Sequence, residues 1–197
     1  MKQVKDLEDN VAKFFGAKYA VAVDSCTHGL ELCLRMQNIK ELCVPKRTYI
    51  SVPFLANKLG IPLKWKEESW QDYYFIEGTN IADAAVLWRK GSYIPNTFMC
   101  LSFQFQKHLS LGRGGMILTD NKQAAEDLKK MSYDGRLPDV PWRNQNINTI
   151  GYHYYMTPET AKLGLSYFDE AVKQKPRQWV ITDWPDLTKM DIFKNSL

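Results

Sequence analysis

Residues 102–120, SFQFQKHLSLGRGGMILTD, combine residue types that could do covalent chemistry. Ser102 stands five residues before Lys107, a turn with three glycines follows, and 116–119 form an apolar segment typical of a short buried strand. A lysine amine that is held in place can attack a carbonyl group. The alternative is a surface lysine, which is the commonest fate of this residue type.

Three further features stand at the ends of predicted strands. In DSCTHG a helix begins near Thr27, and its free N–H groups suit a phosphate, although Ser25 or Thr27 could also simply cap the helix. Asp83 in IADAA could pair with a ring nitrogen or a metal, or it could be an ordinary turn aspartate. Tyr49 in VPKRTYIS could stack on a ligand or belong to the core.

Composition excludes several classes of function. The chain has 197 residues, of which 45% are hydrophobic and 24% charged, and these values are ordinary for one globular domain. The net charge of +4 comes without a stripe of Lys and Arg, so no nucleic-acid partner is expected. We find no membrane-length apolar run and no signal peptide. Four cysteines without a CxxC pair and three scattered histidines favour a reduced, cytoplasmic protein without a metal site.

Helical and strand periods alternate along the chain, which predicts an α/β fold with a mostly parallel central sheet flanked by helices. In such a sheet, ligands bind at the carboxyl ends of the strands. Gly16, Gly60 and Gly135 each close a predicted helix, and Thr157 is an expected N-cap. Helices are predicted at 5–15, 27–37, 49–60, 121–135 and 157–174, and strands at 19–25, 41–45, 61–67, 80–88, 97–104 and 115–120.

Five blocks between about Val4 and about Lys173 carry a family pattern. They are FFGAKYAVAVDSCTHGLELCL, VPKRTYISVPFLANKLGIPLKW, IADAAV, LSFQFQKHLSLGRGGMILTDN and GYHYYMTPETAKLGLSYFDEA. In this order they resemble the DegT/DnrJ/EryC1/StrS aminotransferases, which are enzymes of fold type I that depend on pyridoxal 5′-phosphate (PLP) and aminate keto sugars carried on nucleotides. IADAAV resembles the acidic motif of the family, and the fourth block resembles its lysine motif with the serine-to-lysine spacing intact.

The resemblance implies a role for each residue singled out above. Lys107 matches the lysine that bonds covalently to the aldehyde of PLP, and Asp83 matches the acid that keeps the pyridine nitrogen protonated. These two residues would be catalytic. The phosphate anchors of the family fall on Cys26, Thr27 and Ser102. Its aromatic residue that stacks on the cofactor ring falls on Tyr49.

The resemblance also implies a homodimer with shared active sites. Family members complete each site with a second subunit through the loop that reads GYHYYMT here, residues 151–157. Tyr155 stands where the family has Asn or Arg, and that position normally reaches the cofactor phosphate of the partner subunit. The loop holds consecutive aromatic residues, a composition that suits an interface.

The chain departs from the family in several places. Residues 1–175 correspond to a single PLP-binding large domain and 176–197 to a C-terminal tail, so the small C-terminal domain of the family is expected to be absent. Val86 replaces a glutamine of the acidic motif, and His108 replaces the asparagine after the lysine. The departures remove contacts that family members use around the cofactor.

The connection SWQDYYFIEGTN, residues 69–80, is another departure. Family members carry a further strand and helix here, and a parallel crossover needs about a dozen residues or more. We therefore expect a strand to be missing, with the strand that leads to Asp83 paired directly to 41–45. The central sheet would then have about six strands.

These observations predict a PLP-dependent aminotransferase. The expected amino donor is glutamate, and the expected acceptor is a nucleotide-linked keto sugar or a smaller keto compound. The alternative is a reduced relative that binds PLP or a partner protein without turnover. Retention of Lys107, Asp83, Ser102 and Tyr49 favours the enzyme, whereas loss of the small domain favours the alternative, because that domain helps to exclude water.

Overall fold

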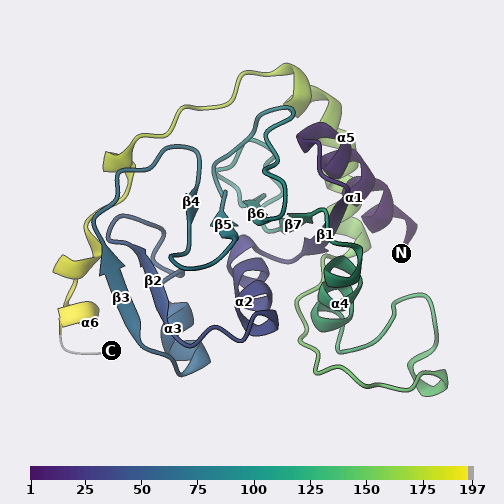
Figure 1. Ribbon diagram of the computed structural model, residues 1–197. Coiled ribbons are helices and arrows are strands. Elements are labelled where there is room, and N and C mark those ends of the chain that lie inside the picture. The colour runs from purple at the N-terminus through teal and green to yellow at the C-terminus, as the bar shows by residue number, and fades with distance from the viewer. Residues whose placement is uncertain (195–197) are drawn as a thin grey trace.

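The computed structural model describes residues 1–194, and seven strands form two sheets in this range (Figure 1). The smaller sheet pairs β2 with β3. The larger sheet has the order β1-β7-β6-β5-β4. The bounds are Tyr19–Val23 for β1, Leu42–Pro45 for β2, Leu63–Lys66 for β3, Tyr74–Phe75 for β4, Ile81–Asp83 for β5, Phe98–Ser102 for β6 and Gly115–Thr119 for β7.

The α/β class is confirmed, but the larger sheet is mixed rather than mostly parallel. Within it only β5 and β6 run parallel, while β4 with β5, β6 with β7 and β7 with β1 are antiparallel. β6 is joined to β7, and β4 to β5, by connections that contain no helix. Such connections favour antiparallel neighbours, since a parallel pair needs a crossover.

The expectation of a missing strand next to β5 is wrong. β4 lies within the connection 69–80 and pairs antiparallel with β5, so that Tyr74 is opposite Asp83. Figure 1 shows β4 between β5 and the β2–β3 pair, and the N–H of Glu77 donates to the Cys43 carbonyl on β2 at 3.1 Å. A hairpin needs only a short turn, so this connection can supply a strand although it is too short for a crossover helix.

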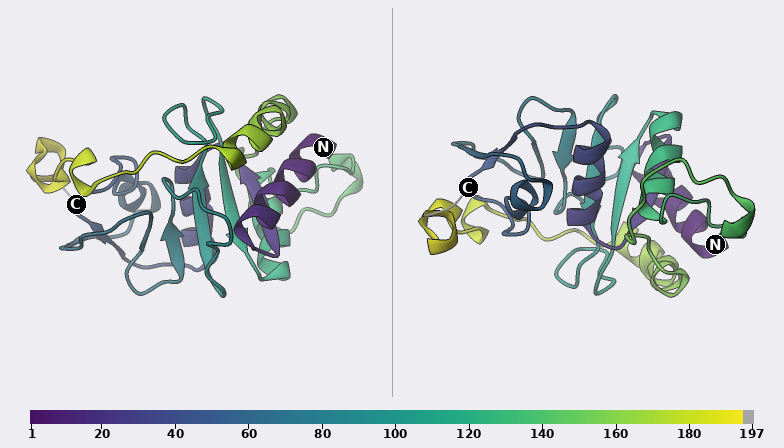
Figure 2. Two further views of the ribbon diagram at one scale, coloured as in Figure 1. Left: turned by 90° about the horizontal axis from the view of Figure 1, so that it is seen from above. Right: turned by 90° about the horizontal axis from the view of Figure 1, so that it is seen from below.

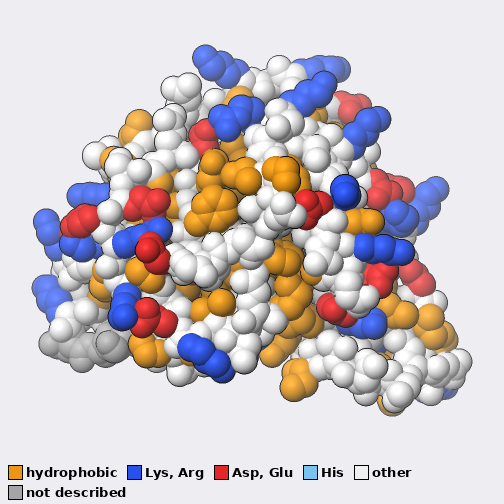
Figure 3. All heavy atoms as spheres, viewed as in Figure 1, with side chains coloured by type: hydrophobic (Ala, Val, Ile, Leu, Met, Phe, Trp, Pro, Cys, Tyr) orange, Lys and Arg blue, Asp and Glu red, His pale blue; other side chains and the backbone are white. Residues whose placement is uncertain are grey.

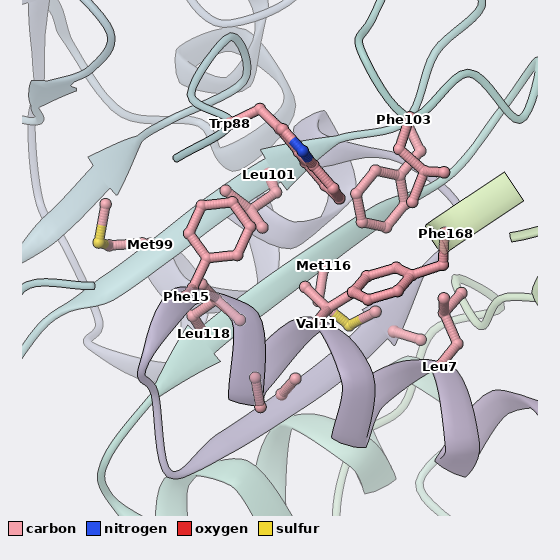
Figure 4. Close-up of a cluster of buried hydrophobic side chains, with 14 of the residues drawn as sticks. Leu7, Val11, Phe15, Trp88, Met99, Leu101, Phe103, Met116, Leu118 and Phe168 are labelled. Atoms are coloured by element: carbon pink, nitrogen blue, oxygen red, sulfur yellow. The ribbon is translucent and has the colours of Figure 1, made fainter. Parts of the chain in front are cut away.

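Helices cover both faces of the larger sheet (Figure 2). On one face, α1 (Lys2–Phe15) and α5 (Pro158–Lys173) bury Leu7, Val11 and Phe168 against alternate side chains of the strands, as the close-up in Figure 4 shows. On the other face lie α2 (Cys26–Met36) and α4 (Lys122–Ser132), and α3 (Phe54–Leu59) lies beside the β2–β3 pair. The alternation follows from the period of two in a strand, which sends neighbouring side chains to opposite faces.

The five predicted helices are all present, with different bounds. Gly16 adopts a left-handed φ of 83° after α1, as a helix-ending glycine should. The hydroxyl of Thr157 caps α5 by accepting the N–H of Thr160 at 3.2 Å. α3 begins only at Phe54, after a turn over 50–53 and directly after Pro53, which fits the first turn of a helix but not its interior.

The tail, residues 174–194, leaves α5 and crosses to the far side of the molecule (Figures 1 and 2). Two backbone groups hold it beside β2: the N–H of Leu187 donates to the Lys46 carbonyl at 2.9 Å, and the Arg47 guanidinium donates to the Trp184 carbonyl at 2.7 Å. Its elements are η2 (Ile181–Asp183), η3 (Leu187–Lys189) and α6 (Asp191–Lys194). The end of the expected tail 176–197 lies beyond the described residues.

Candidate active site

The strand register brings the nominated residues to one edge of the larger sheet. Asp83 at the end of β5 is opposite Cys100 on β6, and Ser102 at the end of β6 is opposite Gly115 on β7. Gly115 is in turn opposite Val23 at the end of β1, directly before the turn into α2. The carboxyl ends of β1, β5 and β6 therefore share one edge, where ligands bind in this class of sheet.

A cavity of about 620 Å³ opens at this edge. Its volume lies within the range of roughly 300–1,000 Å³ that small-molecule sites occupy. Hydrophobic side chains gather in the middle of the face seen in Figure 3, and Lys and Arg side chains are scattered around it without a continuous stripe. Six nominated residues line the cavity: Cys26, Thr27, Tyr49, Asp83, Ser102 and Lys107.

Asp83 is buried, and both of its carboxylate oxygens are fixed. Oδ2 accepts the phenol of Tyr74 at 2.8 Å, and Oδ1 accepts the N–H of Ala85 at 3.0 Å. Burial raises the pKa of Asp83 above its ordinary value, and those two hydrogen bonds together with the charge of Lys107 act in the opposite direction. The carboxylate is thus held in one orientation at the floor of the cavity.

Lys107 extends into the same cavity from the loop after β6. Its Nζ lies 4.6 Å from the centroid of the Trp179 ring. Burial lowers the pKa of Lys107 below its ordinary value, while the charges of Asp83 and Cys26 act against the change and Arg177 adds to it. A lowered pKa increases the share of neutral amine, which is the form that attacks carbonyl groups.

The start of α2 forms a region of the cavity that suits an anion. The N–H of His28 donates to the Ser25 hydroxyl and that of Gly29 to the Ser25 carbonyl, so the N–H groups of Cys26 and Thr27 precede the first bonded ones. The hydroxyl of Thr27 lies 2.6 Å from that of Ser51. Amides and hydroxyls at a helix N-terminus are a general means of binding phosphate.

Gly115 allows β7 to approach the start of α2 closely. A Cβ on Gly115 would lie 2.5 Å from the backbone nitrogen of Cys26, which is closer than side chains tolerate. The neighbouring Gly114 forms a bridge with Ser25. The glycine pair in the sequence is therefore explained by its contact with the anion-binding start of α2 as well as by the turn after Lys107.

Tyr155, the residue assigned to the partner subunit, does not line the cavity of its own chain. It forms a backbone bridge with Val23 and packs edge-on against Tyr133 and His153, with ring centroids 4.7 and 4.8 Å away. Arg113 lines the cavity instead, and its guanidinium pairs with Asp24 at 2.6 Å. A cation thus stands near the anion-binding region without a contribution from Tyr155.

The other two family positions that differ in sequence, Val86 and His108, lie in different places. Val86 lines the cavity, where it adds apolar surface. The ring nitrogen Nε2 of His108 lies 2.7 Å from the Ala171 carbonyl of α5, and its ring packs beside Trp88. His108 therefore contacts α5 rather than the cavity residues.

Sequence reasoning nominated Tyr49 but missed the other aromatic residues around the site. Tyr74 fixes Asp83 from a strand too short to show a period. Trp70, Trp179 and Trp184 line the cavity, and the rings of Trp70 and Trp184 are 4.6 Å apart. The two tryptophans of the Pro-containing tail could have indicated that the tail packs against the domain, because such large apolar side chains are usually buried against other residues.

Within residues 1–194, no helix is long and apolar enough to cross a membrane. No group of three or more His, Cys, Asp or Glu side chains in this part of the chain is arranged to hold a metal ion.

The class defined by this geometry is an α/β protein with a small-molecule site at the carboxyl ends of its strands. The family model of the DegT/DnrJ/EryC1/StrS aminotransferase family matches residues 1–63 and 89–182. This match covers well over half of the chain, so the protein belongs to that family. The unmatched residues 64–88 contain β4, β5 and Asp83.

Two curated relatives share about a quarter of their aligned residues with the chain. The uncharacterized protein MJ1066 of Methanocaldococcus jannaschii is 26% identical over 226 residues, covering 87% of this chain and 58% of the relative. The spore coat polysaccharide biosynthesis protein SpsC of Bacillus subtilis is 24% identical, covering 79% of this chain and 51% of the relative. The chain therefore spans about half the length of the curated relatives it matches.

Solved structures show the same fold at low identity. A Bacillus cereus ATCC 10987 protein proposed to be a PLP-dependent aminotransferase has a TM-score of 0.75 and 14% identity, covering 99% of this chain and 81% of that one. The sugar aminotransferase CalS13 of Micromonospora echinospora has a TM-score of 0.70 and 13% identity, covering 87% of this chain and 61% of that one.

Proposed function

We propose that the chain is the PLP-binding part of an aminotransferase, with residues 1–175 as the cofactor-binding domain. The observation that carries this proposal is the convergence of a buried carboxylate, Asp83, and a partly buried amine, Lys107, on one cavity. Family membership supports the reaction class. The same cavity holds an anion-binding helix start, which a phosphorylated cofactor requires.

The residues present fit PLP. Asp83 would hold the proton on the ring nitrogen, and Tyr74 would keep the carboxylate in place. The amides of Cys26 and Thr27 and the hydroxyl of Ser102 would bind the phosphate. Tyr49, which is 56% exposed, would cover the ring from the mouth of the cavity. The close approach permitted by Gly115 keeps the phosphate region free of a side chain.

PLP, when bound, withdraws electrons from the carbon that carries the amino group of an amino acid. The chain contributes the rest of the chemistry. Lys107 would hold the cofactor covalently, and its neutral Nζ would move a proton at the substrate carbon. Asp83 would keep the ring nitrogen protonated, and the aromatic walls of the cavity would exclude water.

We propose an amino acid donor, with glutamate first, and a nucleotide-linked keto sugar or a smaller keto compound as acceptor. The sugar assignment is supported by the names of SpsC, a polysaccharide biosynthesis protein, and CalS13, a sugar aminotransferase. We also propose a cytoplasmic homodimer in which residues 151–157, including Tyr155, lie near the site of the partner subunit. The aromatic composition of this loop supports the assembly.

A second candidate is a relative that binds PLP or a partner protein without turnover. It is favoured by the family match, which leaves out residues 64–88 and therefore Asp83. The position of Asp83 opposite Cys100 at the strand ends and its place in the Lys107 cavity support the enzyme instead.

An absorbance spectrum separates the two candidates. Purified protein with PLP should show a visible absorption band that is lost in Lys107→Ala, and glutamate should convert that band in the wild type. Lys90→Ala, which removes an exposed lysine, is the matched control and should retain both properties. A band that forms but does not respond to any amino donor would support the binding-only candidate, and identical spectra for wild type and Lys107→Ala would refute both roles of Lys107.

A further inference from the structure

The tail contributes a wall of the cavity. Trp179, Asp183, Trp184 and Leu187 line it together with Lys107. Trp184 and Leu187 are buried and fixed beside β2, and α5 fixes the other end. The span 174–183 between these two fixed points, called the tail span here, crosses the cavity with mostly exposed side chains.

Trp179 is the residue of the tail span that contacts Lys107. Its ring lies 4.6 Å from the Lys107 Nζ, and the same ring lies 4.0 Å from the guanidinium carbon of Arg177. Arg177 is fixed by an ion pair with Asp183 at 2.8 Å. One indole ring therefore serves as a surface for two cations, of which one is the candidate catalytic amine.

We propose that Trp179 and Arg177 are positioning residues for Lys107: the Trp179 ring covers the amine and holds Arg177 beside it. This inference rests on the proposed function for its purpose, which is to keep the amine desolvated and reactive. Its geometric part, a cover and a neighbouring cation on the tail span, stands independently of the cofactor.

Three charged or titratable groups face Lys107 from the surrounding elements. Asp83 on β5 and Cys26 on α2 favour the charged amine, while Arg177 on the tail span disfavours it. Burial, to which a covering indole adds, is the largest influence and lowers the pKa of Lys107. Contact between an ammonium and the ring face acts in the opposite direction. We expect desolvation to outweigh that contact, because water would replace the ring if it were removed.

Competitive acetylation with trace acetic anhydride tests this inference without PLP. The extent of labelling of Lys107 is followed across pH by mass spectrometry of the full chain after digestion, with exposed Lys90 as internal reference. In Trp179→Ala the midpoint of Lys107 labelling should move to higher pH by roughly half a unit or more. Arg177→Gln should give a smaller shift in the same direction, because it removes a repelling charge.

Conservative and distant variants control for structural damage. Trp179→Phe retains a ring face and should restore a midpoint near that of the wild type. Trp142→Ala and Arg143→Gln remove the same side-chain types at exposed positions of η1 (Trp142–Asn144) and should leave the midpoint unchanged. Thermal unfolding of every variant shows that the fold persists. An unchanged or lower midpoint in Trp179→Ala overturns the inference.

Attachment of PLP, measured on the same variants, separates this inference from the proposed function. The rate of PLP attachment to Lys107 should show the same pH shifts. If PLP attaches to wild-type Lys107 but Trp179→Ala has the wild-type midpoint, the positioning role is wrong and the proposed function stands. If acetylation midpoints shift as expected but PLP never attaches, the proposed function is wrong and the cover on Lys107 stands.

Discussion

The phenol of Tyr74 donates a hydrogen bond of 2.8 Å to Asp83 and lies 2.6 Å from the hydroxyl of Thr48. This chain of three side chains connects β4, β5 and the turn after β2, and two of its members, Thr48 and Asp83, line the cavity. Burial and the neighbouring carboxylate raise the pKa of Tyr74 well above its ordinary value, so the phenol remains a hydrogen-bond donor. The orientation of Asp83 depends on this donor.

Tyr74→Phe should therefore remove the hydrogen bond that fixes Asp83 in the site. One oxygen of a buried carboxylate loses its partner, which should cost about 1–3 kcal/mol in the free energy of unfolding. Transamination should fall by roughly tenfold, while PLP still binds. Urea unfolding and single-turnover rates with glutamate measure the two effects, and Tyr167→Phe on the exposed side of α5 is the control. Wild-type rates in Tyr74→Phe would show that Asp83 needs no support from this residue.

Asp83→Asn should separate PLP binding from catalysis. PLP binding should largely persist, whereas transamination should fall by roughly a hundredfold or more, the size expected when a preorganised charge is removed. Half-reaction rates with glutamate measure the loss. A variant with full rates would give Asp83 another role.

The difference in unfolding free energy between the wild type and Asp83→Asn should depend on pH in a defined direction. The pKa of Asp83 is raised on folding, so its contribution to stability is fully present below the ordinary carboxyl pKa and is lost as pH rises through the folded value. The asparagine remains neutral throughout. Unfolding free energies of the PLP-free proteins, measured from pH 4 to 8, should shift in favour of the variant as pH rises. A shift in favour of the wild type would mean that Tyr74 and Lys107 outweigh burial.

Gly115→Ala should damage the phosphate region specifically. The added Cβ would meet backbone atoms of Ser25 and Cys26 at 2.5 Å, and overpacking of this kind costs about 1–3 kcal/mol. Because α2 must shift to make room, the affinity for PLP should fall by more than the affinity of pyridoxal, which lacks the phosphate. Titrations with both compounds provide the comparison. Equal losses for the two would place the phosphate elsewhere.

The proposed homodimer gives a further prediction. Light scattering at micromolar concentration should show twice the chain mass, and Tyr155→Ala should reduce PLP retention if the residue reaches the site of the partner subunit. Within one chain, Tyr155 packs on Tyr133 and His153, so His153→Ala serves to test loss of that packing alone. A clean monomer of the wild type would contradict the shared-site assembly.

The sequence predicted the site residues that stand at or near the ends of predicted strands. Asp83, Ser102 and the start of α2 were placed at one edge because the α/β pattern fixes which ends of the strands meet. Lys107 follows the same edge through its short spacing from Ser102. Family motifs then assigned roles that residue types alone left open.

Other features depend on contacts between distant parts of the chain and could not be predicted. β4 has two residues, too few for a period, and its existence depends on the hairpin turn and on pairing with β5. The contact between Trp179 and Lys107 joins the tail to a loop between strands. The tail has no helix or strand period, so its sequence does not show which part of the chain its aromatic rings pack against.

Reduction of the PLP-treated protein with borohydride, followed by peptide mapping, tests the central claim most directly. The account predicts that the pyridoxyl group is found on Lys107 in the wild type and that no lysine is specifically labelled in Lys107→Ala. Labelling spread over exposed lysines such as Lys90, with the same pattern in Lys107→Ala, would contradict the assignment of this cavity as the cofactor site.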